Sequence, residues 1–289
     1  MPETREPQPP PGREPLRPDA LERALVRPGG LWRAVEVYPE LASTNTELAA
    51  RARRGGGDAT VVVTDHQTSG RGRRDRGFET PARAALTFSV LVRPGVPPTR
   101  LGWLPLLMGV AAVDAVREAA GCAAGVKWPN DVLATGGRDG TQRKLAGILS
   151  EAVTSEEGIA VVVGMGLNVT QTRDELPTPS ATSLVVENAS LREREPLLRA
   201  VLDGFAAGYT AWVSAGGDAA ASGLAQRYRE RCDTVGRRVR VELPNGRVVT
   251  GPATGVDADG HLLVRTPSGE EALSAGDVVH VRPDAEGAE

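Results

Sequence analysis

The chain has 289 residues, of which 40% are hydrophobic and 3% aromatic, and its net charge at pH 7 is −3. This length suits one large domain and one small domain, and the lack of a basic excess argues against a dedicated nucleic-acid-binding protein. The two cysteines and three widely spaced histidines form neither a disulfide framework nor a metal-binding motif, so no metal ligands are expected from protein side chains.

No apolar run is seen that reaches the roughly 18 residues of a membrane span, and the first residues lack the apolar centre of a signal peptide. We therefore expect a cytoplasmic protein without membrane attachment. Residues 1–28 are predicted to be a disordered tail, because residues 1–17 are rich in proline and charge, although residues 19–25 suit a short helix.

A catalytic domain is predicted over residues 29–233. Its first part holds a strand at 34–38, a helix that follows Ser43 and ends at the glycines 55–57, and strands at 59–67 and 85–92. Thr44 and Glu47 have the spacing of a capping box at the start of that helix. A largely buried helix is predicted at 101–120, with Pro105 near its first turn, where proline is tolerated.

The second part of this domain alternates strands with turns. VKWPNDVLA (126–134) is a strand interrupted at Pro129 and the following Asn-Asp pair, 136–143 is a hairpin loop, strands follow at 144–153 and 159–169, and helices at 193–213 and 218–232. After residue 233, short alternating strands are separated by Asn-Gly, Asp-Gly and Ser-Gly pairs typical of hairpins. We predict an α+β fold with about five strands in a small barrel at 235–283 and a tail at 284–289.

Residues 69–78, SGRGRRDRGF, are the strongest local candidate for ligand binding. Glycines let backbone N–H groups approach a ligand, and arginines donate forked hydrogen bonds to carboxylates and phosphates. Asp75 stands where a GxGxxG motif would need glycine, and the GK[ST] of a P-loop is missing. The loop indicates another kind of anion site or, alternatively, a solvated turn.

Four further motifs place polar residues beside glycines or buried strands. They are Ser43-Thr44-Asn45, Lys127-Trp128-Pro129-Asn130-Asp131, Lys144 at the start of KLAGIL, and Gly164-Met165-Gly166-Leu167-Asn168. Each also has an ordinary structural interpretation: a helix cap, a charged strand end, a flanking lysine or a strand bulge. No Ser/His/Asp or Cys/His set is evident, so the combination favours charge stabilisation at a phosphate, assisted by Mg²⁺, over attack by an enzyme nucleophile.

Taken in order, STN (43–45), HQTSGRGRR (66–74), KWPND (127–131), KLAGIL (144–149) and GMGLN (164–168) resemble the motifs of bacterial biotin–protein ligases, also called biotin–[acetyl-CoA-carboxylase] ligases. The resemblance runs from about residue 35 to 283. It implies a mixed or antiparallel sheet packed by helices, as in class II aminoacyl-tRNA synthetases, and an SH3-like C-terminal barrel. It also implies that biotin and ATP, with Mg²⁺, react to biotinyl-5′-AMP, from which biotin passes to a lysine of a biotin carboxyl carrier domain.

The resemblance implies a role for each motif residue. Biotin is expected to contact Ser43, Thr44, Asn45, Gln67, Gly70, Arg71, Gly72, Arg73 and Lys144, and the nucleotide Arg71, Arg73, Asn130, Asp131, Lys144 and Asn168. Catalytic roles are expected of Arg71, Lys127, Asp131 and Lys144. The cations would offset repulsion between the biotin carboxylate and the α-phosphate, and Asp131 would orient or deprotonate the carrier lysine. The arginine loop is expected to close over the ligands and exclude water.

Two features depart from the family pattern. Asp75 replaces a glycine, and it either pairs with Arg74 or Arg76 or lies in solvent. Repressor-type members carry an N-terminal helix-turn-helix domain, whereas the roughly 30 residues before the catalytic start here are proline-rich and lack a two-helix pattern. We therefore expect a monofunctional ligase that does not bind DNA.

Two alternatives remain open. Lipoate ligases and octanoyl transferases share the catalytic architecture, but octanoyl transfer uses a cysteine nucleophile, and Cys122 and Cys232 lie in or beside predicted helices without a partner base. A nucleic-acid-binding protein that uses the arginine loop is disfavoured by the negative net charge and the scarcity of aromatics. Both a monomer and a homodimer are compatible with the sequence.

Overall fold

The computed structural model describes residues 13–73, 77–137 and 141–280. Within these residues a seven-stranded sheet forms the larger unit, with the strand order β1-β2-β3-β7-β6-β5-β4. Its strands are β1 (Ala34–Tyr38), β2 (Thr60–Thr64), β3 (Ala85–Val92), β4 (Ala124–Lys127), β5 (Asp131–Ala134), β6 (Arg143–Ser155) and β7 (Gly158–Asn168). Strands β1 and β2 are parallel and the other pairs antiparallel, so the expected mixed sheet is confirmed.

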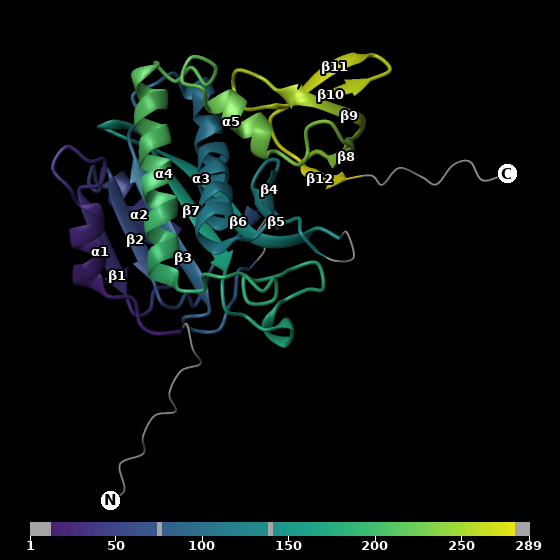
Figure 1. Ribbon diagram of the computed structural model, residues 1–289. Helices are drawn as coiled ribbons and strands as arrows, with labels where there is room; N and C mark the ends of the chain where they lie inside the picture. Colours follow the sequence, from purple (N-terminus) through teal and green to yellow (C-terminus); the bar gives the residue numbers. More distant parts are fainter. Residues whose placement is uncertain (1–12, 74–76, 138–140, 281–289) are drawn as a thin grey trace, which may run out of the picture.

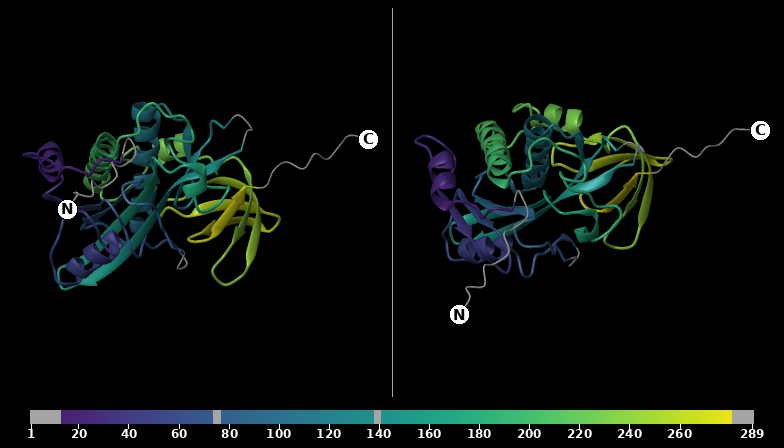
Figure 2. Two further views of the ribbon diagram at one scale, coloured as in Figure 1. Left: turned by 90° about the horizontal axis from the view of Figure 1, so that it is seen from below. Right: turned by 60° about the horizontal axis from the view of Figure 1, so that its bottom comes forward.

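Helices cover both faces of this sheet (Figures 1 and 2). They are α1 (Pro18–Leu25), α2 (Thr44–Arg53), α3 (Trp103–Ala120), α4 (Arg194–Ser214) and α5 (Leu224–Arg231), with 3₁₀ turns η2 (Pro98–Gly102) and η3 (Arg173–Glu175). A hydrophobic core lies on each face of the sheet. Strand β2 contributes to both, because successive side chains of a strand point to opposite faces. Val61 and Val63 join the large core with α3 and α4, whereas Val62 joins a small core under α2.

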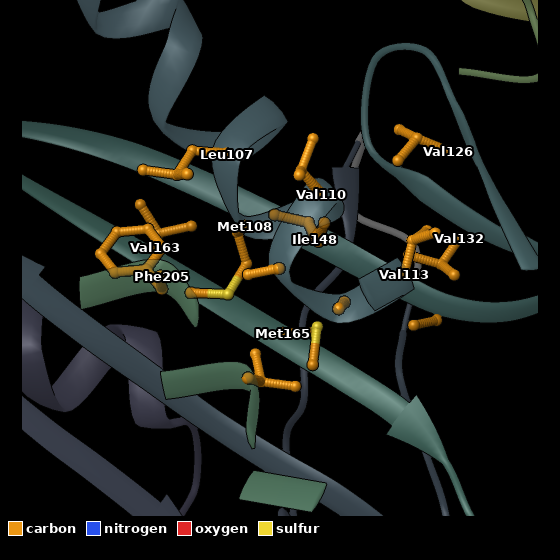
Figure 3. Packing of buried hydrophobic residues seen from close by; sticks show 14 of the residues in the cluster. Leu107, Met108, Val110, Val113, Val126, Val132, Ile148, Val163, Met165 and Phe205 are labelled. Atoms are coloured by element: carbon orange, nitrogen blue, oxygen red, sulfur yellow. The ribbon is translucent and has the colours of Figure 1, made fainter. Parts of the chain in front are cut away.

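Helix α3 is the centre of the large core. Figure 3 shows Leu107, Met108 and Val110 of α3 packed near Ile148 of β6 and Phe205 of α4. By length and composition alone, residues 98–120 could cross a membrane. Most of this segment is buried in the protein, which is the environment of a core helix.

The N-terminal residues contradict the predicted disordered tail from residue 13 onward. Leu16, Leu21 and Leu25 are at most 5% exposed and belong to the large core. Arg13 makes a partly buried ion pair with Glu175, with Nη2 2.5 Å from Oε2. Proline and charge indicated disorder locally, but tertiary partners far along the chain order this segment. Residues 1–12 lie outside the described part of the chain.

The C-terminal unit is a five-stranded antiparallel sheet, as expected, with the order β11-β10-β9-β8-β12. Its strands are β8 (Arg238–Glu242), β9 (Val248–Val256), β10 (Leu262–Thr266), β11 (Gly269–Leu273) and β12 (Asp277–His280). The unit lies beside β4 and β5 (Figure 2), and its buried residues continue the large core. Trp128 connects the large sheet to the C-terminal unit, because its indole N–H donates to the carbonyl of Gly260 at 3.1 Å.

Candidate active site

A cleft of about 870 Å³ lies where one end of the large sheet meets the C-terminal unit. It is lined by Ser43, Thr44, Asn45, Gln67, Arg71, Gly72, Arg73, Lys127, Asn130, Asp131, Lys144 and Asn168. Of the predicted site residues, all of which lie in the described part of the chain, only Gly70 is outside this lining. Its carbonyl instead accepts from the N–H of Phe78 at 2.9 Å and closes the base of the arginine loop.

The STN motif forms the start of helix α2 at the cleft. Ser43 is the N-cap and accepts from the N–H of Thr46 at 3.4 Å. The predicted capping box between Thr44 and Glu47 is therefore wrong: Thr44 is already the first helical residue, and Glu47 pairs with Arg51 one turn on. The helix thus begins one residue earlier than a cap at Thr44 would require, and Ser43 is the capping side chain.

A chain of buried polar contacts fixes the side chains of this motif. The N–H of Thr44 donates to Gln67 Oε1 at 2.9 Å, and Thr44 Oγ1 lies 2.7 Å from Ser89 Oγ. Ser89 donates to Asn45 Oδ1 at 2.6 Å, and Asn45 Nδ2 donates to Glu151 Oε2 at 2.8 Å. Both amides are thus held in one orientation, as a site that recognises a polar ring needs.

The arginine loop crosses the cleft and is tied down at two places. Arg71 Nη2 donates to Thr46 Oγ1 at 3.1 Å and lies 3.5 Å from Glu151 Oε1. Arg73 Nη1 donates to Asn130 Oδ1 at 2.9 Å and to the carbonyl of Gly276 at 3.3 Å. The two guanidinium groups therefore link the loop to α2 and β6 on one side and to the β4–β5 turn and the C-terminal unit on the other. Residues 74–76, including Asp75, lie outside the described residues.

The KWPND turn between β4 and β5 places acid and base together. Lys144 Nζ lies 2.6 Å from Asp131 Oδ1, so these two residues form an ion pair in the cleft wall. Lys127 and Asp131 are opposite each other in the β4–β5 register. Asn130 donates its side-chain N–H to the carbonyl of Ile148 at 3.0 Å, and its own carbonyl accepts from the N–H of Ile148. The turn is thereby held against β6.

The GMGLN motif supplies close backbone approach rather than a phosphate loop. A Cβ on Gly164 would overlap Asn45 Oδ1, and a Cβ on Gly166 would overlap the ring of Phe78. Asn168 uses both ends of its amide structurally: Nδ2 donates to the carbonyl of Thr182 at 2.9 Å, and Oδ1 accepts from Gln171 at 3.0 Å. Asn168 therefore holds the loop after β7 while it lines the cleft.

Several residues that line the cleft were not predicted from the sequence. They are Phe78, Glu79, Gln171, Glu175, Thr178, Ser180, Glu242, Gly276, Asp277 and Val279. Phe78 had a signal, since Gly166 in a buried strand indicated a close neighbour. The residues of β8 and β12 had none, because they follow ordinary strand alternation and reach the cleft only through the docking of the C-terminal unit.

Neither cysteine has the properties of a nucleophile at this site. Burial raises the pKa of the Cys122 thiol to about 11, and it also raises the pKa of Cys232. Neither residue lines the cleft. Because the thiolate is the reactive form, the octanoyl-transferase interpretation loses support.

Sequence and structure comparisons agree with this geometry. Residues 40–168 match the biotin/lipoate A/B protein ligase family, and residues 234–281 match the biotin protein ligase C terminal domain. A biotin–[acetyl-CoA-carboxylase] ligase of Mycobacterium tuberculosis is 41% identical over 93% of this chain and 97% of its own length, and one of Paracoccus denitrificans is 30% identical over 82% and 96%. The structure of biotin protein ligase from Aquifex aeolicus in complex with biotin and ATP superposes with a TM-score of 0.70 at 25% identity, covering 87% of this chain and 100% of that one. The chain belongs to the biotin/lipoate A/B protein ligase family, and within it to the biotin protein ligases.

Proposed function

We propose that the protein is an ATP-dependent biotin–protein ligase that modifies a lysine of the biotin carboxyl carrier domain of acetyl-CoA carboxylase. The observation that carries this proposal is one cleft that joins the buried polar cluster at the start of α2 to Arg71, Arg73, Lys127 and Lys144. The cluster suits the uncharged polar ring of biotin, and the cations suit a carboxylate beside a phosphate. The similarity to the M. tuberculosis enzyme supports the same activity.

In the first step, a carboxylate oxygen of biotin attacks the α-phosphorus of ATP and pyrophosphate leaves with the electrons of the broken P–O bond. Two anions must approach, and the fixed cations Lys127 and Lys144 would lower the cost of that approach. Arg71 and Arg73 would hold the acyl phosphate from the loop side.

Magnesium would enter with the nucleotide. Among the described residues, no group of three His, Cys, Asp or Glu side chains lies close enough to hold a metal by itself. Mg²⁺ usually takes most of its ligands from phosphate and water, with one or two carboxylates. The cleft fits such an ion as part of the ATP substrate, with Asp131 as an available carboxylate.

In the second step, the uncharged ε-amine of the carrier lysine attacks the acyl carbon, and AMP leaves as the new amide forms. We propose that Asp131 orients this amine and accepts its proton. The contact with Lys144 fixes the direction of the carboxylate. The arginine loop would meanwhile exclude water from the adenylate, which hydrolyses when exposed.

One incubation tests the proposal. The protein is mixed with biotin, ATP and Mg²⁺, and biotinyl-5′-AMP is sought by mass spectrometry; a carrier domain is then added and its mass increase measured. We expect adenylate and a biotinylated carrier, and no product when lipoate or octanoate replaces biotin. Product from lipoate but not biotin would favour a lipoate ligase. Absence of any adenylate, with nucleic-acid binding that persists at moderate salt, would overturn the proposal.

A further inference from the structure

A chain of hydrogen bonds runs from the active-site turn to the last strand of the C-terminal unit. The backbone N–H of Trp128 donates to Thr234 Oγ1 at 3.0 Å, and Thr234 Oγ1 lies 3.1 Å from His280 Nε2. His280 Nδ1 lies 3.3 Å from Gln142 Oε1, and Gln142 Nε2 donates to Asp233 Oδ2. The participants come from four segments that are distant in sequence.

The carboxylate at one end of this chain fixes the direction of its bonds as far as the imidazole Nδ1, and Nε2 of a neutral ring is then the acceptor. The amide of Trp128 can only donate, and the carboxylate of Asp233, which is held by Arg237 at 2.8 Å, can only accept. Gln142 must therefore turn its oxygen towards His280, so the imidazole donates from Nδ1. Nε2 is then left as the acceptor for the Thr234 hydroxyl proton. Burial lowers the pKa of His280 to about 4, which agrees with a neutral ring.

His280 belongs to the strand that forms a wall of the cleft. Strand β12 contributes Asp277 and Val279 to the lining, and the carbonyl of Gly276 just before it accepts from Arg73. Arg73 also holds Asn130, so this wall meets the side of the cleft where the nucleotide is proposed to bind. The segment between α5 and β8 is also held against β4, the strand that leads into the turn, because the N–H of Asp233 donates to the carbonyl of Val126 at 2.8 Å.

We propose that His280, as the Nδ1–H tautomer, is a positioning residue that sets β12 against the 127–131 turn and so shapes the nucleotide side of the cleft. It touches neither substrate and acts through Thr234 on Trp128, which is 1% exposed and stands between Lys127 and Asn130. This inference rests on the proposed function, since it concerns ATP binding by the ligase. The proposed biotin side is built from α2, β3 and Gln67, and its hydrogen bonds described above involve none of the residues in this chain of bonds. Biotin binding should therefore be insensitive to it.

The test compares three variants of the full-length protein. His280→Leu removes both ring nitrogens, His280→Gln retains a donor and an acceptor, and Thr234→Val removes only the hydroxyl. His261→Leu is the matched control, because His261 lies in the same C-terminal unit, pairs with Asp257 and does not line the cleft. The readouts are KM for ATP and kcat in adenylate formation, Kd for biotin without ATP, and the thermal midpoint.

We expect His280→Leu and Thr234→Val to raise KM for ATP about tenfold, the effect of losing one or two buried hydrogen bonds. The Kd for biotin should stay within about twofold, His280→Gln should recover most of the ATP affinity, and His261→Leu should resemble the wild type. An unchanged KM for ATP, an equal loss of ATP and biotin affinity, or no recovery by glutamine would overturn the proposal. If His280→Leu does not fold, Thr234→Val and His280→Gln decide it.

The tautomer gives a readout that does not depend on catalysis. Nitrogen-15 NMR of the imidazole should show a protonated Nδ1 and an unprotonated Nε2 at neutral pH. The opposite tautomer would overturn the proposal. If the wild-type protein makes no adenylate, the proposed function fails while the NMR result still decides the geometry; if it does and the variants match it, only the positioning role fails.

Discussion

Lys144 Nζ and Asp131 Oδ1 lie 2.6 Å apart on neighbouring strands, in a cleft wall that both residues reach from the sheet. A lysine and an aspartate so placed each fix the position of the other. Both side chains line the cleft, so each is held in place beside the space where the reactants are proposed to bind. This pair therefore links the two half-reactions, because one partner is proposed to act in adenylate formation and the other in transfer.

Replacing Asp131 by asparagine tests the second half-reaction by itself. The substitution keeps the shape but removes the proton acceptor, so transfer from preformed biotinyl-5′-AMP to the carrier should slow by roughly 100-fold or more. Single-turnover transfer, followed by carrier mass, measures this. Asp174→Asn, at an exposed residue that does not line the cleft, serves as the control. Transfer at the wild-type rate would remove Asp131 from the mechanism.

Arg71 is expected to retain the adenylate. Its guanidinium group bonds Thr46 and approaches Glu151, which holds the loop across the cleft. Arg71→Ala should increase the dissociation rate of biotinyl-5′-AMP roughly 10- to 100-fold, as expected for a lost hydrogen bond to a charged group. Stopped-flow or filter assays measure the release, with Arg53→Ala as control, because Arg53 is exposed on α2, the helix that carries Thr46. Equal release rates in both variants would refute the clamp role.

Gly166 is expected not to tolerate replacement even by alanine. A Cβ there would overlap the ring of Phe78, which closes the arginine loop against β7. Displacement of the ring should weaken biotin binding by roughly tenfold, a loss of about 1.4 kcal/mol. Titration calorimetry measures it. Gly255→Ala is a matched control in strand β9, where the added carbon meets Leu263 at an ordinary 3.9 Å. If both variants bind biotin equally well, the close contact between Gly166 and the Phe78 ring is not needed for biotin binding.

The sequence predicted the elements more completely than their contacts. Strand 85–92 was predicted with the bounds that β3 has, because its apolar run is bounded by turn residues. The site motifs could be found because Lys127, Asp131 and Asn168 are polar residues in otherwise buried strands, a costly arrangement without function or partners. Nothing local marks Asp277 or Val279, which look like any alternating strand. Their place in the cleft depends on how two units dock.

Arg13 illustrates the same limit and gives a stability prediction. Its guanidinium group makes four hydrogen bonds, to Glu175 and Thr170, within a nearly buried pocket. Arg13→Ala should lower the free energy of unfolding by about 2 kcal/mol, since Glu175 and the carbonyl of Thr170 lose their partner. Urea unfolding measures it. Arg17→Ala, which breaks an ion pair with Glu195 at a side chain 76% exposed, should change stability little. Equal effects would show that the Arg13 contacts are not stabilising.

His280 should make the folded protein sensitive to mild acid. Its pKa is about 4 in the folded protein against 6.5 for the ordinary side chain, because burial, Lys127 and Arg237 disfavour the cation more than Asp233 favours it. Between these values the unfolded chain binds a proton that the folded chain does not, so stability present above pH 6.5 is lost as pH falls towards 4. The loss between pH 8 and pH 5 should be at most about 2 kcal/mol. Denaturant unfolding at several pH values should show this loss as the difference in stability between the wild type and His280→Gln. Carboxylates such as Glu36 and Glu175, whose pKa values are lowered, contribute equally to the pH dependence of the two proteins. Parallel pH profiles for the two proteins would mean that His280 titrates normally and that its ring is not held neutral by the fold.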